Sequence, residues 1–207
     1  MCCRVILIQN DQYSPKPSQL TATQVEKQTT DIVTKWVNQT TLSDDGWSPL
    51  HLACRDSNDI FEYLVSVGAA TNAKNKNGVS LMHKAAFDDN TYLITYLRDQ
   101  AGLSISDTDF DGNTPLHYAC SNGAEWAAFW LMGFGADVNA LNKNSDSPMH
   151  LLIKNHSKLF GTKTLRELIF KGCNKNHMNK QKKKAIDFAP KIEDSAIRSE
   201  VVKILGP

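Results

Sequence analysis

The sequence has no hydrophobic run long enough to cross a membrane. The longest apolar run near its start, Val5 to Ile8, is too short for a membrane helix of about 20 residues or for the core of a secretory signal. We therefore expect an intracellular, cytoplasmic protein whose five cysteines are reduced. An excess of charge of one sign is also lacking, since the net charge is only +1. Nothing in the overall charge attracts nucleic acid or a membrane surface.

The sequence also lacks the marks of an active site. It contains no evident acid–base pair, phosphate-binding loop or nucleophile with an aligned partner, so we expect a non-catalytic protein with no cofactor and no small-molecule substrate. The hydrophobic fraction of 41% and the charged fraction of 22% are those of an ordinary folded domain. The chain is therefore expected to fold and to act by binding.

One short pattern recurs along the chain. A hydroxyl residue, then proline or leucine, an apolar residue and a histidine return at intervals of roughly 33 residues, ending at His51, His83, His117 and His150. A fixed period of this size means that a small helical unit is stacked on copies of itself. The function should then lie on the surfaces of a solenoid rather than in one catalytic pocket.

The repeated block resembles the ankyrin repeat. The third unit reads DGNTPLHYACSNG from Asp111, followed by GADVNA from Gly135. The second glycine returns as Gly68, Gly102, Gly135 and Gly172, and the polar residue four places later as Asn72, Ser106, Asn139 and Asn176. The resemblance covers about residues 44 to 190. It implies an all-α solenoid of paired helices with hairpin fingers, with about five units and an N-terminal capping helix.

The pattern divides the chain into three parts. Residues 1–19 are expected to form an N-terminal extension and linker, and residues 20–43 a capping helix or partial first repeat. The apolar spacing from Val25 to Val37 predicts that this helix buries one apolar stripe against the first end of the array. The repeat domain spans 44–207, in units of about 44–76, 77–109, 110–142, 143–179 and 180–207. A last helix near 194–205, with Ile197, Val201, Val202 and Leu205 on one side, would close it.

The residues that recur have physical roles within the unit. The hydroxyl residues can cap the first helix of each unit, with proline following at the first helical position. The glycines can end the second helix, because a left-handed backbone is cheap only for glycine. We expect the histidines to bond to backbone in the turns between units, which fixes one repeat against the next.

Two local spacings imitate metal sites. His51 with Cys54, and His117 with Cys120, stand at i and i+3 on one helical face. Because Ala86 fills the equivalent place in the second unit, we expect these cysteines to be buried structural thiols. Residues 107–112 copy the first half of a calcium-binding loop, but Tyr118 stands where the bidentate glutamate is needed. No metal site is predicted.

The candidate binding residues are those that the repeat does not require. In the second helix of the third unit, Trp126, Phe129 and Gly133 stand where the family usually has polar residues, and Trp130 matches a core position of the family. Their spacing of i, i+3, i+4 and i+7 puts them on one face, which predicts a docking site for another protein, unless neighbouring helices or the extra residues at 155–162 cover the rings. Such insertions often mark a binding face.

A basic segment is the second candidate. It includes Lys180, Lys182, Lys183 and Lys184, and it could meet an acidic partner, RNA or a lipid surface, although a solvated fingertip is the default interpretation. No aromatic residues alternate with these lysines, so nucleic acid is disfavoured. Membrane attachment is expected only through acylation of Cys2 or Cys3.

Three functions compete at this stage. The first, which we favour, is a non-catalytic adaptor or structural subunit of a larger hetero-complex. The second is the regulatory or substrate-recruiting segment of an enzyme, because residues 147–189 look like the ankyrin portion of membrane palmitoyltransferases. The Cys-rich core and spanning helices of those enzymes do not occur in this sequence. The third is an inhibitor that masks a transcription factor, which the sequence does not separate from the first.

Overall fold

Pairs of antiparallel helices, stacked side by side, make up the computed structural model, which describes residues 22–41, 45–56, 58–155 and 162–206. A long first helix, α1 (Ala22–Val37), precedes the pairs. The first helices of the pairs are α2 (Pro49–Asp56), α4 (Leu81–Phe87), α6 (Pro115–Asn122), α8 (Pro148–Lys154) and the 3-10 helix η3 (Ala185–Lys191). The second helices are α3 (Asn58–Ser66), α5 (Thr91–Asp99), α7 (Glu125–Gly133), α9 (Lys163–Phe170) and α10 (Ser195–Leu205).

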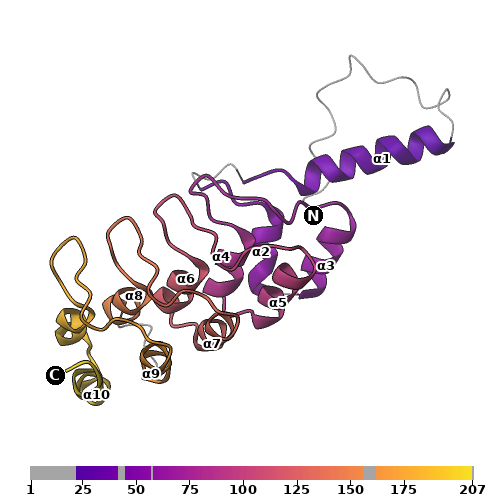
Figure 1. Ribbon diagram of the computed structural model, residues 1–207. Helices are drawn as coiled ribbons and strands as arrows, with labels where there is room; N and C mark the ends of the chain where they lie inside the picture. Colours follow the sequence, from indigo (N-terminus) through magenta and orange to yellow (C-terminus); the bar gives the residue numbers. More distant parts are fainter. Residues whose placement is uncertain (1–21, 42–44, 57, 156–161, 207) are drawn as a thin grey trace.

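The helices form two rows, and hairpin fingers project from one side of the stack (Figure 1). In the first row α4 packs on α6, α6 on α8 and α8 on η3, while in the second row α5 packs on α7 and α7 on α9. The part of the chain that the structure describes contains no β-strand, only an isolated antiparallel bridge between Lys74 and Ser80. The predicted all-α solenoid is confirmed.

Each first helix begins at the residue that the sequence predicts. Ser80, Thr114 and Ser147 take an extended backbone just before α4, α6 and α8. The hydroxyl accepts the N–H of the histidine three positions later, and the imidazole of that histidine accepts the N–H of the capping residue. Two backbone N–H groups that helix geometry leaves unpaired are thereby satisfied reciprocally. Histidine takes the place that glutamate has in the usual capping box.

Glycine ends the second helices, also as predicted. Gly135 follows α7 with a φ of 88°, a left-handed conformation that costs other residues about 1–2 kcal/mol. The reversal lets the Ala136 N–H donate to the Leu131 carbonyl at 3.0 Å, which pairs a carbonyl at the helix end. The chain then turns toward the next finger.

One continuous apolar core runs through the stack, from Leu50 in α2 to Leu205 in α10. Leucine, alanine and methionine supply most of it, and the helices approach closely where alanines such as Ala85, Ala119 and Ala127 are fully buried. Each unit therefore completes its core only by contact with its neighbours, which is the physical basis of stability in a solenoid.

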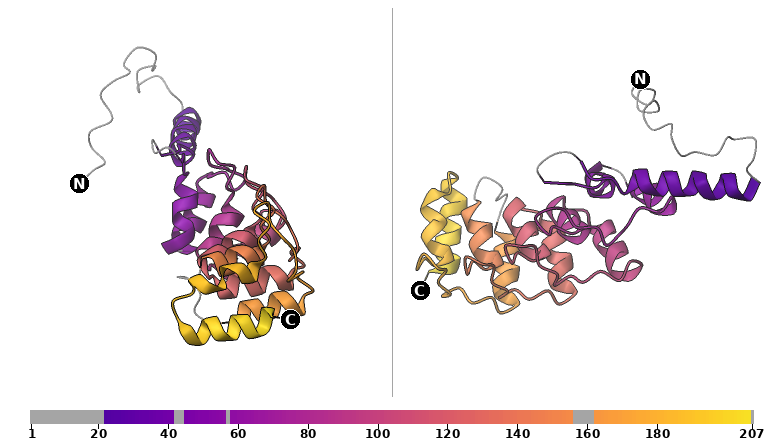
Figure 2. Two further views of the ribbon diagram at one scale, coloured as in Figure 1. Left: turned by 90° about the vertical axis from the view of Figure 1, so that its left-hand side faces the viewer. Right: turned by 90° about the horizontal axis from the view of Figure 1, so that it is seen from above.

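The expected packing of α1 is wrong. The helix forms, but Ile32 and Trp36 are 57% and 54% exposed, and among the α1 side chains that the structure describes Val37 packs against the core. At 16 residues, α1 exceeds the neighbouring α3, which has nine, by about 10 Å at 1.5 Å per residue. Its far turns therefore extend beyond the first pair (Figure 2).

The C-terminal end of α1 is held by polar contacts rather than by an apolar stripe. The Asn38 side chain donates to the Gly68 carbonyl at 2.9 Å and accepts from the Ala70 N–H at 2.8 Å. Asn139 repeats this arrangement later in the chain, where its side chain joins the Gly172 carbonyl and the Asn174 N–H. The same carboxamide device thus joins α1 to the first pair and the third unit to the fourth.

The last pair closes the stack with a modified helix start. Asp187 takes the position of the histidine in η3, and its carboxylate accepts the Lys184 N–H at 2.8 Å. Helix α10 begins after Asp194, which caps the N–H groups of Ala196 and Ile197. Val201 is buried, as predicted, but Val202 is 47% exposed. A buried stripe that includes both Val201 and Val202 is wider than the face that α10 packs against η3.

Candidate protein-binding surfaces

The second to fifth fingers carry the same buried side-chain anchor. Asn142 shows the arrangement: its Oδ1 atom accepts the N–H groups of Asn144 at 2.9 Å and Asp146 at 3.0 Å. Residues Asn75, Asp109 and Asn179, also buried, bind the N–H groups two and four positions later in their own fingers. In such turns a side chain of the loop accepts hydrogen bonds from the loop's own backbone and so fixes its conformation.

The four repeated histidines join each unit to the next finger. Nε2 of His51, His83 and His117 lies 3.1, 2.9 and 3.0 Å from the carbonyls of Val79, Asn113 and Asp146. His150 lies 3.2 Å from the Lys183 carbonyl in the same way. Because a backbone N–H already donates to Nδ1, the ring proton is on Nε2. The prediction that these histidines bond to backbone between units is confirmed.

Burial keeps these histidines neutral. It lowers the pKa of His51 from 6.5 to about 4, and it lowers the pKa of His83, His117 and His150 as well. Both ring nitrogens are already occupied, so the rings have no free site for an ion. Within the described residues, no group of three or more histidine, cysteine or acidic side chains is placed to hold a metal.

The cysteines and the aspartates that imitate metal sites serve the fold. Cys54 is buried and its thiol donates to the Leu50 carbonyl at 3.4 Å, and burial raises its pKa to about 12. Burial also raises the pKa of Cys120. Asp109 is buried, and its carboxylate accepts Asn113 and Asp111 N–H groups and the Tyr118 hydroxyl. Thiols with raised pKa values are poor nucleophiles, and a carboxylate so occupied is a poor calcium ligand.

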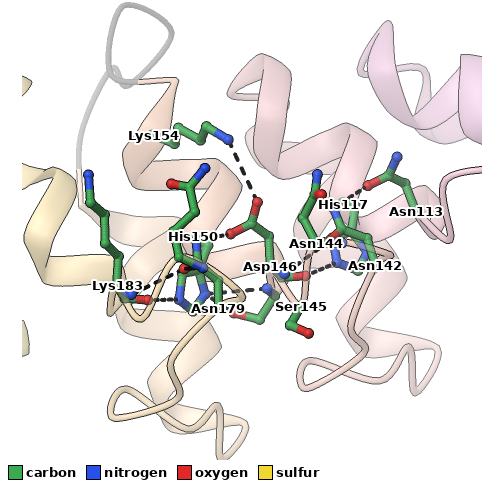
Figure 3. Close-up of polar contacts among 12 residues, drawn as sticks. Asn113, His117, Asn142, Asn144, Ser145, Asp146, His150, Lys154, Asn179 and Lys183 are labelled. Atoms are coloured by element: carbon green, nitrogen blue, oxygen red, sulfur yellow. Dashed lines mark hydrogen bonds and ion pairs between the residues drawn. The ribbon is translucent and has the colours of Figure 1, made fainter.

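A hollow of about 320 Å³ lies between the fingers and the first helices of the third and fourth units. We call it the groove hollow. Its wall combines ring and aliphatic surface with carboxamides, and Figure 3 shows several of these side chains between the fingers. The lining residues that matter here are Phe87, Tyr118, Asn144, Leu151 and Lys154.

The buried carboxylate of Asp146 lines the groove hollow. The Asp146 side chain is almost fully buried, and its Oδ1 atom accepts from the Asn179 side chain of the next finger at 2.6 Å. Its Oδ2 atom lies 3.7 Å from Nζ of Lys154 (Figure 3). Asp146 therefore fixes the fifth finger and the Lys154 side chain relative to the fourth unit. Its contact with Asn179 repeats the contact of Asn113 with Asn142 one unit earlier, but sequence reasoning missed it because the ion pair with Lys154 lies outside the repeat.

The predicted aromatic residues lie on α7, in the second row of helices. We call Trp126, Phe129, Trp130 and Gly133 the α7 patch. Trp126 is 65% exposed and Trp130 is 45% exposed, whereas Phe129 is only partly exposed and packs against the core. The Trp126 and Phe129 rings meet edge to face at 6.3 Å. A Cβ at Gly133 would meet no atom within 4 Å, so the space beside it is open.

Neighbouring side chains hold Trp130 in place. Its indole N–H donates to the Thr95 hydroxyl of α5 at 2.8 Å, and its ring meets Phe134 edge to face at 6.1 Å. The Arg98 guanidinium lies 3.4 Å from the centre of the Phe134 ring. These contacts order the patch across two units. Sequence reasoning missed Thr95, Arg98 and Phe134, since only a pattern of contacts between units could have indicated them.

The predicted basic residues lie on the fifth finger. Lys180, Lys182 and Lys183 are exposed, and Lys184 is partly exposed. Lys182 has a φ of 57°, where other fingers have glycine. Lys183 accepts His150 with its carbonyl while its ammonium group lies 5.6 Å from the centre of the Phe188 ring. Its backbone is thus structural and its side chain is available to a partner.

Some sequence-based expectations fall outside the described residues. These are the extension at 1–19 with Cys2 and Cys3, and most of the extra segment at 155–162. Among the described helices, none is long and apolar enough to span a lipid bilayer.

Comparison with known proteins agrees with the geometry. The profile of ankyrin repeats (3 copies) matches residues 19–109 and 67–142, more than half of the chain. Among curated relatives, "Inhibitor of Apoptosis OPG037" of Monkeypox virus is 36% identical over 117 residues, 55% of this chain and 26% of that protein. "Transient receptor potential cation channel subfamily A member 1" of Homo sapiens is 32% identical over 116 residues, 53% of this chain and 10% of that protein.

A third relative matches a larger share of the chain. "Target of rapamycin complex 2 subunit AVO2" of Saccharomyces cerevisiae is 28% identical over 167 residues, 78% of this chain and 38% of that protein. The chain thus spans only about a quarter of the OPG037 relative and less than half of AVO2. The capped helix pairs, the histidine links between units and the matching profile lead to one conclusion: this chain belongs to the ankyrin repeat family, whose repeats bind protein partners.

Proposed function

We propose that this protein is a non-catalytic adaptor or structural subunit that docks a partner protein on the α7 patch. The observation that carries the proposal is the exposure of Trp126 and Trp130 on adjacent turns of one helix. A tryptophan side chain offers a large, stiff apolar surface, and interface hot spots are rich in tryptophan. Neither ring belongs to the hydrophobic core, so packing of the core does not require a tryptophan at either position.

The order of the patch also supports docking. The Thr95 hydroxyl and the Phe134 ring already fix Trp130, so binding would cost little additional side-chain entropy. A rigid aromatic surface with an open place at Gly133 suits close approach of a partner's backbone. The relative AVO2 is named as a subunit of a complex, which agrees with this assignment.

An occluding inhibitor is the second candidate, because relatives are named inhibitors of apoptosis. Such an inhibitor would use the same kind of surface to cover a partner's active or binding site. The regulatory segment of an enzyme has less support, since no relative named above is described as a palmitoyltransferase.

Affinity purification from the native source, with quantitative mass spectrometry, tests the proposal. The bait would be the wild-type chain, the double variant Trp126→Ser/Trp130→Ser, and the matched control Tyr63→Ser, which removes an exposed ring from α3. We expect a partner at fixed stoichiometry with the wild type and the control. Its loss from the double variant, with unchanged circular dichroism, supports the proposal, and its retention contradicts it.

The identity of the co-purified proteins separates the candidates. A stable assembly of several subunits indicates an adaptor or subunit, whereas a single partner whose activity falls on binding indicates an inhibitor. Recovery of an attached membrane enzyme would instead indicate an enzyme segment.

A further inference from the structure

We propose that the side of the stack lined by the first helices and the third to fifth fingers binds an acidic, extended segment of a protein, with one apolar side chain in the groove hollow and carboxylates on Lys154 and Lys183. This site goes beyond the α7 patch, because it lies between the fingers and the first helices rather than on the second row of helices. The two sites are thus testable separately.

The groove hollow provides the apolar part of the site. Phe87, Tyr118 and Leu151 contribute apolar surface to a volume of about 320 Å³. That volume lies at the lower end of the range of about 300–1,000 Å³ for small-molecule pockets, and it is sufficient for one aliphatic or aromatic side chain. Asn144 stands at the finger side of the hollow, where its carboxamide can pair with the backbone of the bound segment.

Two lysine ammonium groups lie close to one buried ring, and one of these lysines, Lys154, lines the hollow. Nζ of Lys154 and Nζ of Lys183 lie 6.0 and 5.6 Å from the centre of the same Phe188 ring. Figure 3 shows both side chains on the same side of the fourth and fifth fingers. In an extended peptide, side chains two residues apart are separated by about 6.6 Å. Because both Nζ atoms lie within about 6 Å of one ring centre, they are at most about 12 Å apart, a span that side chains two or four residues apart in an extended peptide can cover.

The local charge is positive and largely uncompensated. Lys180, Lys182 and Lys183 are exposed, and within the described ranges no carboxylate forms an ion pair with any of them. Asp146 is the carboxylate nearest to Lys154, and it is buried and shared with the Asn179 side chain. An acidic partner supplies the counter-charge that the protein itself does not place at the surface.

An acidic peptide fits these residues better than a nucleic acid does. Single strands bind by stacking bases on exposed aromatic faces between basic residues. The ring nearest to both Lys154 and Lys183 is Phe188, which is only 3% exposed, so the basic segment itself offers no face for a base. The hollow accepts an apolar side chain instead, which an acidic protein segment can carry.

Fluorescence anisotropy with the full chain tests the proposal. The probe is a fluorescein-labelled 11-residue peptide with glutamates on both sides of a central leucine. Matched peptides carry glutamine for every glutamate, or serine for the leucine, and a fluorescein-labelled oligouridine tests the nucleic-acid alternative. The protein variants are Lys183→Gln, Asn144→Trp to fill the hollow, and the control Lys203→Gln, which removes an exposed charge from α10.

The proposal predicts a specific order of affinities. The acidic peptide binds wild type and Lys203→Gln equally, Lys183→Gln binds it about two- to fivefold more weakly, and Asn144→Trp at least about tenfold more weakly. Loss of the leucine weakens binding by about tenfold or more, and higher salt weakens it further. Equal binding of the acidic and glutamine peptides, equal effects of Lys183→Gln and Lys203→Gln, or tighter binding of oligouridine each overturns the proposal.

Discussion

We expect acid to lower the folding stability of the stack, because its buried histidines resist protonation in the folded state. The variant His51→Gln should remove the part of this acid sensitivity that His51 contributes. The neutral ring of His51 accepts the Ser48 N–H and pairs with the Val79 carbonyl, and burial lowers its pKa from 6.5 to about 4. Glutamine at this position of a capping box can still reach back to the capping N–H. It has no charge to gain, however, so its contribution to stability does not change with pH.

The sign and size of the effect follow from proton linkage. The unfolded chain binds a proton near pH 6.5 and the folded chain only near pH 4, so stability is fully present above 6.5 and falls as the pH drops toward 4. Between pH 7.5 and pH 4.5 one such histidine loses about 2.5 kcal/mol of folding free energy. At pH 7.5 the variant lacks the hydrogen bond from the side chain at position 51 to the Val79 carbonyl, which contributes about 1 kcal/mol.

Urea unfolding, followed by circular dichroism at both pH values, measures this difference. We expect His51→Gln to be less stable than wild type by about 1 kcal/mol at pH 7.5. At pH 4.5 we expect it to be more stable than wild type by about 1.5 kcal/mol, because glutamine does not titrate and the variant avoids the free-energy loss that His51 causes in acid. The same scan on Lys76→Gln, a change on the neighbouring finger, serves as a control. A difference between wild type and His51→Gln that is independent of pH would refute the reasoning.

Three further predictions concern stability. Ser145→Gly should raise the unfolding free energy by about 0.5–1 kcal/mol, since Ser145 has a φ of 57° where other fingers have glycine; a lower urea midpoint would contradict this. Asn139→Ala should lower it by about 1–2 kcal/mol through the loss of two hydrogen bonds between units, and an unchanged thermal midpoint would show that these bonds contribute nothing. Trp36→Ser should change it by less than about 0.5 kcal/mol because the ring is mostly exposed, whereas a large loss in calorimetry would mean that α1 is packed.

The sequence was a reliable guide wherever structure depends on local chemistry. The cap at Thr114, the proline after it and the stop at Gly135 each act within one turn of helix, so their residue types predict the geometry. The role of His117 also follows, because the repeat carries its partner carbonyl to the same relative place in every unit.

Contacts that depend on three-dimensional packing could not be predicted in the same way. The periodicity of α1 suggested a buried stripe, but whether Ile32 is buried depends on the length of the neighbouring helix. Arg98 and Asp146 make their important contacts outside the repeating pattern, one across the Phe134 ring and one to Lys154. No single-sequence periodicity marks such pairs.

The most direct test of the account is the protonation of the four repeated histidines, since all else assumes that they hold the repeats together. Nitrogen-15 NMR of the imidazole rings reports both tautomer and pKa. The account predicts that His51 stays neutral at pH 6 and that the pKa values of His83, His117 and His150 lie below the ordinary value, each ring with its proton on Nε2. Titration of these rings near pH 6.5, or a proton on Nδ1, would contradict it.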